Sequence, residues 1–375
     1  MKQTTAILAV LLTVVISAYA RHDNVPTMGR PSQNNHSVNI SGKLCLYNDK
    51  GEMPEIDFTC ITKQQRCYVT KYRDEKRAAI SFTYDDGLLE HYTMVAPELE
   101  KRGFRGSFWI IGNMVGVEKH RNGPRMSWAQ VREMSKRGHD MGSHTWSHPK
   151  LMLINDIDSL RSEFTRVDSA FAANGIPKPM TVAYPYNGQN AKVRIVAEKG
   201  RIGSRVRQVG QGEDSSKMTP EKLSAWLRQT IDRGEWGITM THGIKTGYDT
   251  WHHPEWLWHF YDEVKAKEDS VWVGTFAEVQ AYETERLHTD FKVGEKRDKT
   301  IITPVQIDAA TLDPLHPALS PAIFHEPLTL RIDGDYRGKT LVAKQAGKLL
   351  TVTNKGDHIL VNINPFGGKI TLLSE

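Results

Sequence analysis

The feature that most constrains this fold is a regular alternation of short apolar runs and helical stretches between about residues 77 and 285. Seven runs have the length of buried strands: Ala78–Thr83, Phe104–Ile111, His139–Ser143, Met180–Tyr184, Arg201–Val206, Trp236–Thr241 and Val271–Thr275. Helix start signals lie between the runs, namely a capping box at Ser127 and Gln130, Thr219 before Pro220, and Pro254. Such alternation favours parallel strands joined by crossover helices, in an open sheet or a barrel.

Polar clusters follow four of these runs, at the point where each strand would end. They are Asp85-Asp86-Gly87 after the first run, His144 and His148 after the third, Tyr184-Pro185-Tyr186-Asn187 after the fourth, and His242 after the sixth. The carboxyl ends of parallel strands meet at one mouth of a barrel, where the reacting groups of such folds gather. We therefore expect the four clusters to lie close together.

Each cluster taken alone has an ordinary structural explanation. Asp-Asp-Gly can form a turn that caps the next helix, and a single histidine such as His242 is more often structural than catalytic. The joint position of all four clusters at strand ends favours a chemical role instead. Two imidazoles at i and i+4 with one carboxylate suit a divalent cation that keeps open positions for water and substrate. The second carboxylate of the adjacent pair can then act as a base.

Residues 78–285 resemble the NodB-type polysaccharide deacetylases, which form carbohydrate esterase family 4. The segment Thr83–Gly87 matches the family motif Thr-Phe/Tyr-Asp-Asp-Gly, and His144 to His148 matches the motif His-Ser/Thr-x-x-His. The resemblance implies an α/β fold, specifically a distorted (β/α)7 barrel of NodB type. It also implies a divalent metal held by Asp86, His144 and His148, with Zn²⁺ preferred over Co²⁺, Ni²⁺ or Mn²⁺.

The same resemblance implies the catalytic roles. Asp85 would be the general base, His242 the general acid, and the backbone N–H of Tyr186 would bind the oxyanion of the tetrahedral intermediate. An amide nitrogen leaves only when it is protonated, so a histidine acid favours N-acetyl over O-acetyl substrates.

The sequence departs from the family pattern at two positions. Ala183 stands where the third motif usually has an arginine that orients the catalytic aspartate. Asp85 therefore needs another partner, and Arg205 and Arg207 after the fifth run are the candidates. Thr241 stands where a leucine usually precedes the motif histidine, which changes the expected pocket for the acetyl methyl group.

We therefore predict a metal-dependent deacetylase that removes acetyl groups from polysaccharides or oligosaccharides. Two alternatives stay open: an O-acetyl-xylan esterase or other amidase on the same scaffold, and a catalytically weak glycan-binding protein, which the missing arginine would suit. The expected partner is an acetylated glycan. The balance of 49 Lys and Arg against 44 Asp and Glu, without a long block of one sign, gives no indication of nucleic-acid binding. The sequence does not indicate the oligomeric state.

Residues 1–20 are typical of a secretory signal peptide. Lys2 gives the positive start, residues 6–18 form a short apolar run, and Ala18-Tyr19-Ala20 is a small-x-small cleavage site. A cut after Ala20 and a secreted or periplasmic protein are predicted. The apolar run is shorter than the roughly 20 residues of a membrane-spanning helix, so no stable membrane anchor is expected.

The remaining chain is predicted to form three parts. Residues 21–74 would be a polar leader, with glycosylation sequons at Asn35 and Asn39, and a short strand-rich lead-in. Of the three cysteines, Cys45, Cys60 and Cys67, at most two are expected to pair. Residues 75–290 would be the deacetylase-like domain.

Beyond about residue 296 the helical period disappears, and five alternating segments predict strands. They are Leu328–Ile332, Thr340–Lys344, Leu349–Thr353, Ile359–Ile363 and Ile370–Leu373. Residues 296–375 are therefore predicted to form a small C-terminal β-sandwich, and glycan binding is the hypothesis for its role.

Overall fold

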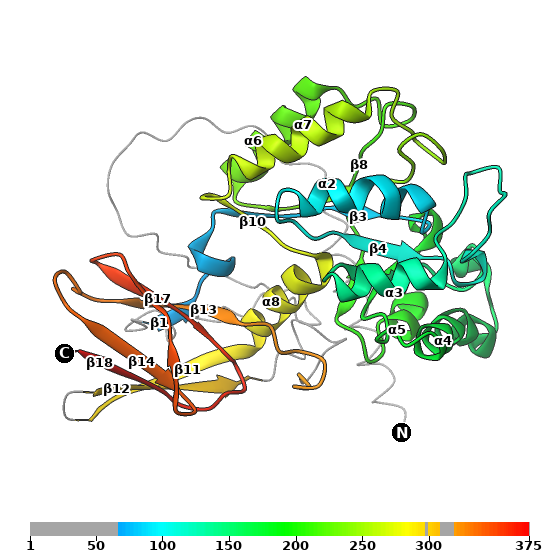
Figure 1. Ribbon diagram of the computed structural model, residues 1–375. Helices are drawn as coiled ribbons and strands as arrows, with labels where there is room; N and C mark the ends of the chain where they lie inside the picture. Colours follow the sequence, from blue (N-terminus) through cyan, green and yellow to red (C-terminus); the bar gives the residue numbers. More distant parts are fainter. Residues whose placement is uncertain (1–66, 297–298, 308–318, 375) are drawn as a thin grey trace, which may run out of the picture. The chain divides into compact units, whose positions relative to one another are not determined.

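The computed structural model describes residues 67–296, 299–307 and 319–374 (Figure 1). The predicted signal peptide, the leader with its two sequons, and Cys45 and Cys60 lie outside the described residues. Among the described helices, none combines the length and the apolar character that crossing a membrane requires.

The alternation of strands and helices is present, with shorter bounds than the apolar runs. The strands are β2 (Ala78–Ser81), β3 (Thr83–Tyr84), β4 (Ser107–Ile110), β5 (Asp140–Ser143), β6 (Thr181–Ala183), β7 (Gly203–Arg205), β8 (Val209–Gly210), β9 (Trp236–Met240) and β10 (Val271–Val273). The helices are α2 (Ala96–Glu100), α3 (Trp128–Lys136), α4 (Ile157–Ala173), α5 (Ala191–Ala197), α6 (Pro220–Arg233), α7 (Pro254–Lys265) and α8 (Phe276–His288). All seven predicted strands are found, and β8 is an addition.

The parallel strands form two hydrogen-bonded sheets, in the orders β3-β4-β5-β6-β7 and β10-β2-β9-β8. The sheets are continuous in space, because β2 and β3 are two parts of one extended segment and a parallel bridge joins Tyr84 to Thr241, just after β9. The α/β class with a curled parallel sheet is thereby confirmed, whereas the closed seven-unit barrel stays a prediction. The start signals work as expected, since Ser127 caps α3 in a full capping box and Thr219 caps α6 before Pro220.

In the first strand segment, apolar and polar side chains lie on opposite faces of the sheet. Side chains alternate along a strand, so Ile80, Phe82 and Tyr84 share one face and join the large hydrophobic cluster under α2 and α7. Ser81 and Thr83 point the other way and are completely buried. Asp85 is the next residue on this second, polar face.

The C-terminal part consists of antiparallel strands. They are β11 (Thr289–Lys296), β12 (Lys299–Gln306), β13 (Leu328–Asp333), β14 (Leu341–Gln345), β15 (Lys348–Leu350), β16 (Val352–Asn354), β17 (His358–Ile363) and β18 (Ile370–Ser374). With β1 (Cys67–Val69) they form two sheets, in the orders β1-β13-β17-β16 and β11-β12-β18-β14-β15. The predicted strand Leu349–Thr353 is divided into two short strands, because the chain passes there from β15 in one sheet to β16 in the other.

One buried cluster joins these sheets to the parallel part. It contains Leu330 and Ile359 of one sheet, Leu372 of the other, and Trp236 and Phe276 of the parallel part. The predicted boundaries at residues 74–75 and 290–296 thus cross a continuous core, and the β-sandwich itself stays a prediction.

Cys67 of β1 is buried and forms no disulfide bond. Burial raises the pKa of its thiol to about 12, so the thiol is protonated and unreactive at neutral pH.

Candidate metal and catalytic site

The predicted site residues come together at the carboxyl ends of the parallel strands. They are Asp85 and Asp86 after β3, His144 and His148 after β5, Tyr186 after β6, Arg205 at the end of β7, and His242 after β9. This is the mouth at which the sequence placed them.

Asp86, His144 and His148 form a compact group of three potential metal ligands. Oδ1 of Asp86 lies 3.6 Å from Nε2 of His144 and 3.8 Å from Nε2 of His148, and the three ligand atoms lie within 4.8 Å of one another. Oδ1 of Asp86 is also buried without a hydrogen-bond partner among the described residues. A buried carboxylate oxygen that faces two imidazole nitrogens but receives no proton fits a divalent cation.

The surroundings prepare both histidines as ligands. Nδ1 of His144 lies 2.8 Å from the carbonyl oxygen of Ala183, which can only accept a hydrogen bond, so Nδ1 carries the proton and Nε2 keeps its lone pair. Burial, helped by the neighbouring His144, lowers the pKa of His148 to about 4, so this imidazole is neutral at physiological pH. Ala183 therefore contributes its backbone, although it lacks the family's arginine side chain.

The loop that carries the two histidines adopts an unusual backbone. Thr145 and His148 have φ values of 66° and 57°, in the left-handed region that non-glycine residues rarely adopt. The turn is closed by a hydrogen bond of 3.0 Å from the backbone N–H of His148 to Oγ1 of Thr145. Such strain persists only where the surrounding structure fixes it, which is common at functional sites.

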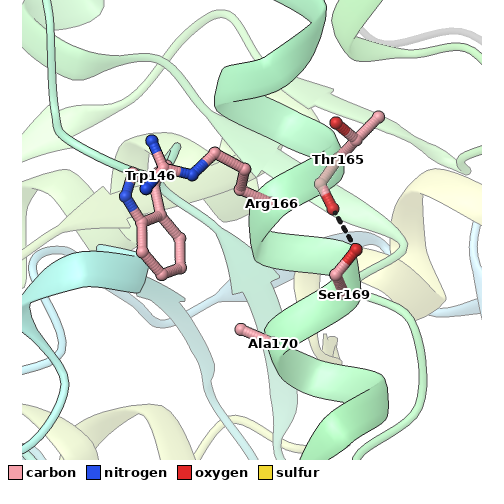
Figure 2. A pocket seen from close by; sticks show the side chains of 5 residues that line it. All are labelled: Trp146, Thr165, Arg166, Ser169 and Ala170. Atoms are coloured by element: carbon pink, nitrogen blue, oxygen red, sulfur yellow. Dashed lines mark hydrogen bonds between the residues drawn. The ribbon is translucent and has the colours of Figure 1, made fainter.

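Trp146, between the two histidines, anchors this loop to α4. Figure 2 shows the guanidinium of Arg166 over the Trp146 indole, in a shallow pocket completed by Thr165, Ser169 and Ala170. The guanidinium carbon lies 4.3 Å from the ring centroid. Glu163 accepts hydrogen bonds of 2.8 Å from both the backbone N–H and the hydroxyl of Ser147. The loop is thus held by a rigid helix.

Asp85 has a cationic partner in Arg205. Nη2 of Arg205 lies 2.5 Å from Oδ2 of Asp85, and Nη1 donates to the hydroxyl of Thr83 at 2.8 Å. Both side chains are almost completely buried, and the guanidinium packs 4.5 Å from the Trp109 ring centroid. Burial alone raises the pKa of Asp85, but the charge of Arg205, followed by those of His144 and His242, holds that pKa well below its usual range. Asp85 is therefore a carboxylate at neutral pH.

The other arginine candidate does not contact Asp85. Arg207 is exposed, stacks over Trp236, and donates to the carbonyl oxygen of Trp236 at 3.0 Å. Of the two arginines that the sequence offered, only Arg205 lies in position to orient Asp85.

His242 faces the same carboxylate from the end of the neighbouring strand β9. Its Nε2 lies 3.8 Å from Oδ2 of Asp85, and its ring packs edge-on against Tyr248. Oδ1 of Asp85 is buried and has no hydrogen-bond partner in the part of the chain that the structure describes. Oδ2 of Asp85 is therefore occupied by Arg205 and faces His242, while Oδ1 is available to a proton donor.

Tyr186 lies beside the metal ligands. Its ring is 64% exposed and its centroid is 4.7 Å from that of His148. Its backbone, like that of Asn187, is in the left-handed region, with φ values of 57° and 55°. The turn thus holds a non-glycine residue in a strained conformation next to the candidate metal site.

Three further residues contact this site and were not among the predicted ones. Nη2 of Arg125 lies 3.9 Å from Oδ2 of Asp86, the carboxylate oxygen that faces away from the histidines. Glu90 and His91 contact the segment that begins at His242. No motif marks these residues, because each reaches the site only through a contact that the fold creates.

Comparison with known proteins gives a match to one family model and similarity to several proteins. Residues 72–202 match the family model described as polysaccharide deacetylase. A gellan lyase from a Bacillus species is 22% identical over 348 residues, which are 82% of this chain and 13% of the lyase. A peptidoglycan-N-acetylglucosamine deacetylase from Bacillus cereus is 26% identical over 111 residues, which are 29% of this chain and 37% of that deacetylase.

Among solved structures, a family 4 carbohydrate esterase from Streptomyces lividans in complex with acetate matches with a TM-score of 0.41 and 18% identity. The match covers 53% of this chain and 93% of the esterase. The chain spans less than half the length of both curated relatives described above.

Proposed function

We propose that the protein is a secreted, metal-dependent glycan deacetylase of the NodB type with a preference for N-acetyl groups, on the premise that residues 72–202 match the family model described as polysaccharide deacetylase. The observation that carries the proposal is the meeting of Asp85 and His242 with the group Asp86, His144 and His148 at one mouth. The predicted signal peptide, residues 1–20, supports export to a compartment where glycans are accessible.

Asp86, His144 and His148 would hold the metal, with Zn²⁺ as the preferred ion because two imidazoles and one carboxylate suit it. When bound there, the ion supplies Lewis acidity toward an acyl oxygen and lowers the pKa of water.

The chain's own residues would do the proton transfers. Oδ1 of Asp85, which lacks a hydrogen-bond partner among the described atoms, would accept a proton from the attacking water. The backbone N–H of Tyr186 would donate to the oxyanion that develops on the acetyl group. His242 would then protonate the amide nitrogen, so that acetate and a free amino sugar leave.

The proposal is tested by acetate release from three acetylated glycans: N-acetylglucosamine oligomers, peptidoglycan fragments and acetylxylan. We expect release from an N-acetylated glycan to be fastest, because His242 is placed to protonate a poor leaving group. Release from acetylxylan alone would support the O-acetyl esterase instead. No release from any of the three would favour the glycan-binding alternative, which Ala183 motivates and the Arg205–Asp85 pair opposes.

Metal removal is expected to abolish this activity. Dialysis against a chelator should lower acetate release by at least about 10²-fold, because the Lewis acid contributes several kcal/mol to the reaction. Re-addition of Zn²⁺ should restore it. His148→Ala should lose both bound zinc and activity, whereas His120→Ala, at an exposed histidine in another loop, should keep both. Hydrolysis that is indifferent to the chelator and to His148→Ala would overturn the assignment of the metal site.

A further inference from the structure

We propose that Glu90 and His91 are positioning residues that hold the backbone of residues 242–246 and so fix the place of the His242 imidazole. The inference rests on the proposed function, since it concerns the residue assigned as the general acid. Neither residue belongs to a motif, and neither side chain is among the candidate metal ligands.

His91 holds the backbone of His242 itself. Nε2 of His91 lies 2.7 Å from the carbonyl oxygen of His242, across a sequence separation of 151 residues. Because a carbonyl oxygen only accepts, Nε2 of His91 carries the proton and donates it. The His91 ring is completely buried and packs against Tyr84 and Phe108, which stack on each other. Nδ1 of this ring has no hydrogen-bond partner among the described residues, so the bond to His242 is the one hydrogen bond that the His91 side chain makes to them.

Glu90 holds the next turn of the same segment. Its Oε2 accepts hydrogen bonds from three consecutive backbone N–H groups, those of Ile244 at 2.9 Å, Lys245 at 2.9 Å and Thr246 at 3.2 Å. Successive N–H groups that converge in a turn bind an anion, and a carboxylate acceptor makes these bonds stronger than neutral ones. The turn is tight, because a Cβ on Gly243 would lie 1.8 Å from the carbonyl oxygen of Thr246.

Together these contacts tie the acid to the base. The backbone N–H of Asp85 donates to the carbonyl oxygen of Thr241 at 3.0 Å, so the segment is held immediately before His242 as well. Asp85, Glu90 and His91 belong to one short stretch of chain. This stretch carries the proposed base and hydrogen-bonds the backbone both before and after the side chain of the proposed acid, His242. The His242 side chain lies near Asp85 and packs against Tyr248, and it projects from the backbone that Glu90 and His91 hold. We call these contacts of Glu90 and His91 with residues 242–246 the backbone clamp.

The clamp predicts that the rate loss caused by a displaced His242 depends on the leaving group of the substrate. An amide nitrogen needs the proton of His242 before it can leave, whereas 4-nitrophenolate leaves without one. A displaced His242 should therefore slow the hydrolysis of N-acetylglucosamine oligomers much more than that of 4-nitrophenyl acetate. A general loss of folding would slow both reactions alike.

The test compares four variants of the full chain, loaded with zinc, on both substrates. His91→Phe keeps the packing against Tyr84 and Phe108 but removes the donor, and His91→Gln places an amide N–H near the position of Nε2. Glu90→Gln weakens the second contact. Thr93→Ala, an exposed position on the same helical segment η3 (His91–Val95), is the matched control.

We expect His91→Phe to lower kcat for the oligomers about 10- to 100-fold with little change in KM, because small displacements of a catalytic group cost up to about 10²-fold. The rate with 4-nitrophenyl acetate should change less than about threefold, since that reaction needs no acid. His91→Gln should recover most of the loss, Glu90→Gln should shift the ratio of the two rates in the same direction as His91→Phe, and Thr93→Ala should match the wild type.

Three results would overturn the proposal. Equal losses on both substrates in His91→Phe and Glu90→Gln would make the two residues merely structural. Unchanged rates in both variants would show that the clamp is not needed. A wild-type chain that hydrolyses neither substrate would overturn the proposed function, and the role of the clamp with it. The measurement on the wild type distinguishes this result from the first two, in which the wild type is active.

Discussion

Replacing Asp85 by asparagine is expected to lower kcat/KM for acetate release by about 10²- to 10⁴-fold while the bound metal stays in place. The amide of asparagine has no basic oxygen, so it cannot accept the proton that Oδ1 of Asp85 is free to take. The three proposed metal ligands, Asp86, His144 and His148, are untouched by the substitution. The asparagine oxygen can still accept from Arg205, so the neighbouring guanidinium keeps a partner.

The measurement combines acetate release with zinc content per chain. Asp86→Asn is the matched control, because it makes the same chemical change at the adjacent residue but should lose metal and activity together. Asp85→Asn with wild-type turnover would show that Asp85 is not the base. Loss of zinc in Asp85→Asn would show that the two carboxylates do not divide their roles as proposed.

The position of the site could be predicted from the sequence because strand ends are visible in it. Apolar runs of strand length end at Thr83, Ser143 and Thr241, and in a parallel sheet those ends meet. The spacing of His144 and His148 then indicated a metal, and the structure places both beside Asp86. These inferences depend only on local pattern and on the geometry that all parallel sheets share.

Which of Arg205 and Arg207 pairs with Asp85 could not be predicted from the local sequence. Residues two apart share a face of an extended strand, so both arginines were equally placed as partners of Asp85. In the structure β7 ends at Arg205, and Arg207 has already left the sheet and is exposed. The end of a strand to within two residues is set by tertiary packing, which the local sequence does not contain.

Contacts between distant loops were not predictable for a related reason. Glu90 and His91 reach residues 242–246, and Arg125 reaches Asp86 from a loop without any motif. The division of 349–353 between β15 and β16 was also invisible, since alternation continues through the point where the chain changes sheets. Periodicity shows which residues are buried but not which partner they meet.

Replacing Arg205 by methionine is expected to have the largest effect on stability and to move the pH dependence of activity. Methionine preserves much of the volume over Trp109 but leaves the Asp85 carboxylate buried without its main cation. Removing one partner of a buried ion pair costs about 3–5 kcal/mol of unfolding free energy at neutral pH. Arg207→Met is the matched control, and as an exposed arginine it should cost less than about 1 kcal/mol.

The direction of the pH effect follows from the causes of the Asp85 shift. In the wild type burial raises the pKa of Asp85, but the charge of Arg205, the two neighbouring histidines and the hydrogen bond from Arg205 together outweigh burial. The folded-state pKa therefore lies below its usual value, and the carboxylate contributes stability that is lost only as the pH falls through that low pKa. In Arg205→Met the Asp85 carboxyl is still buried but has lost its main cation, so its folded-state pKa rises. Folding of the variant then favours the protonated form of Asp85 more than folding of the wild type does. The stability gap between variant and wild type should therefore narrow as the pH is lowered.

Lowering the pH should reduce the activity of Arg205→Met although it narrows the stability gap, because the proposed base Asp85 works only when it is ionised. The acid limb of kcat/KM in Arg205→Met should move to higher pH by at least about one unit, since the loss of a close opposite charge changes a buried carboxyl pKa by about 1–3 units. Chemical denaturation at several pH values and a pH–rate profile on N-acetylglucosamine oligomers measure both effects. An acid limb that stays in place, with a stability like that of Arg207→Met, would mean that Arg205 does not control the charge of Asp85.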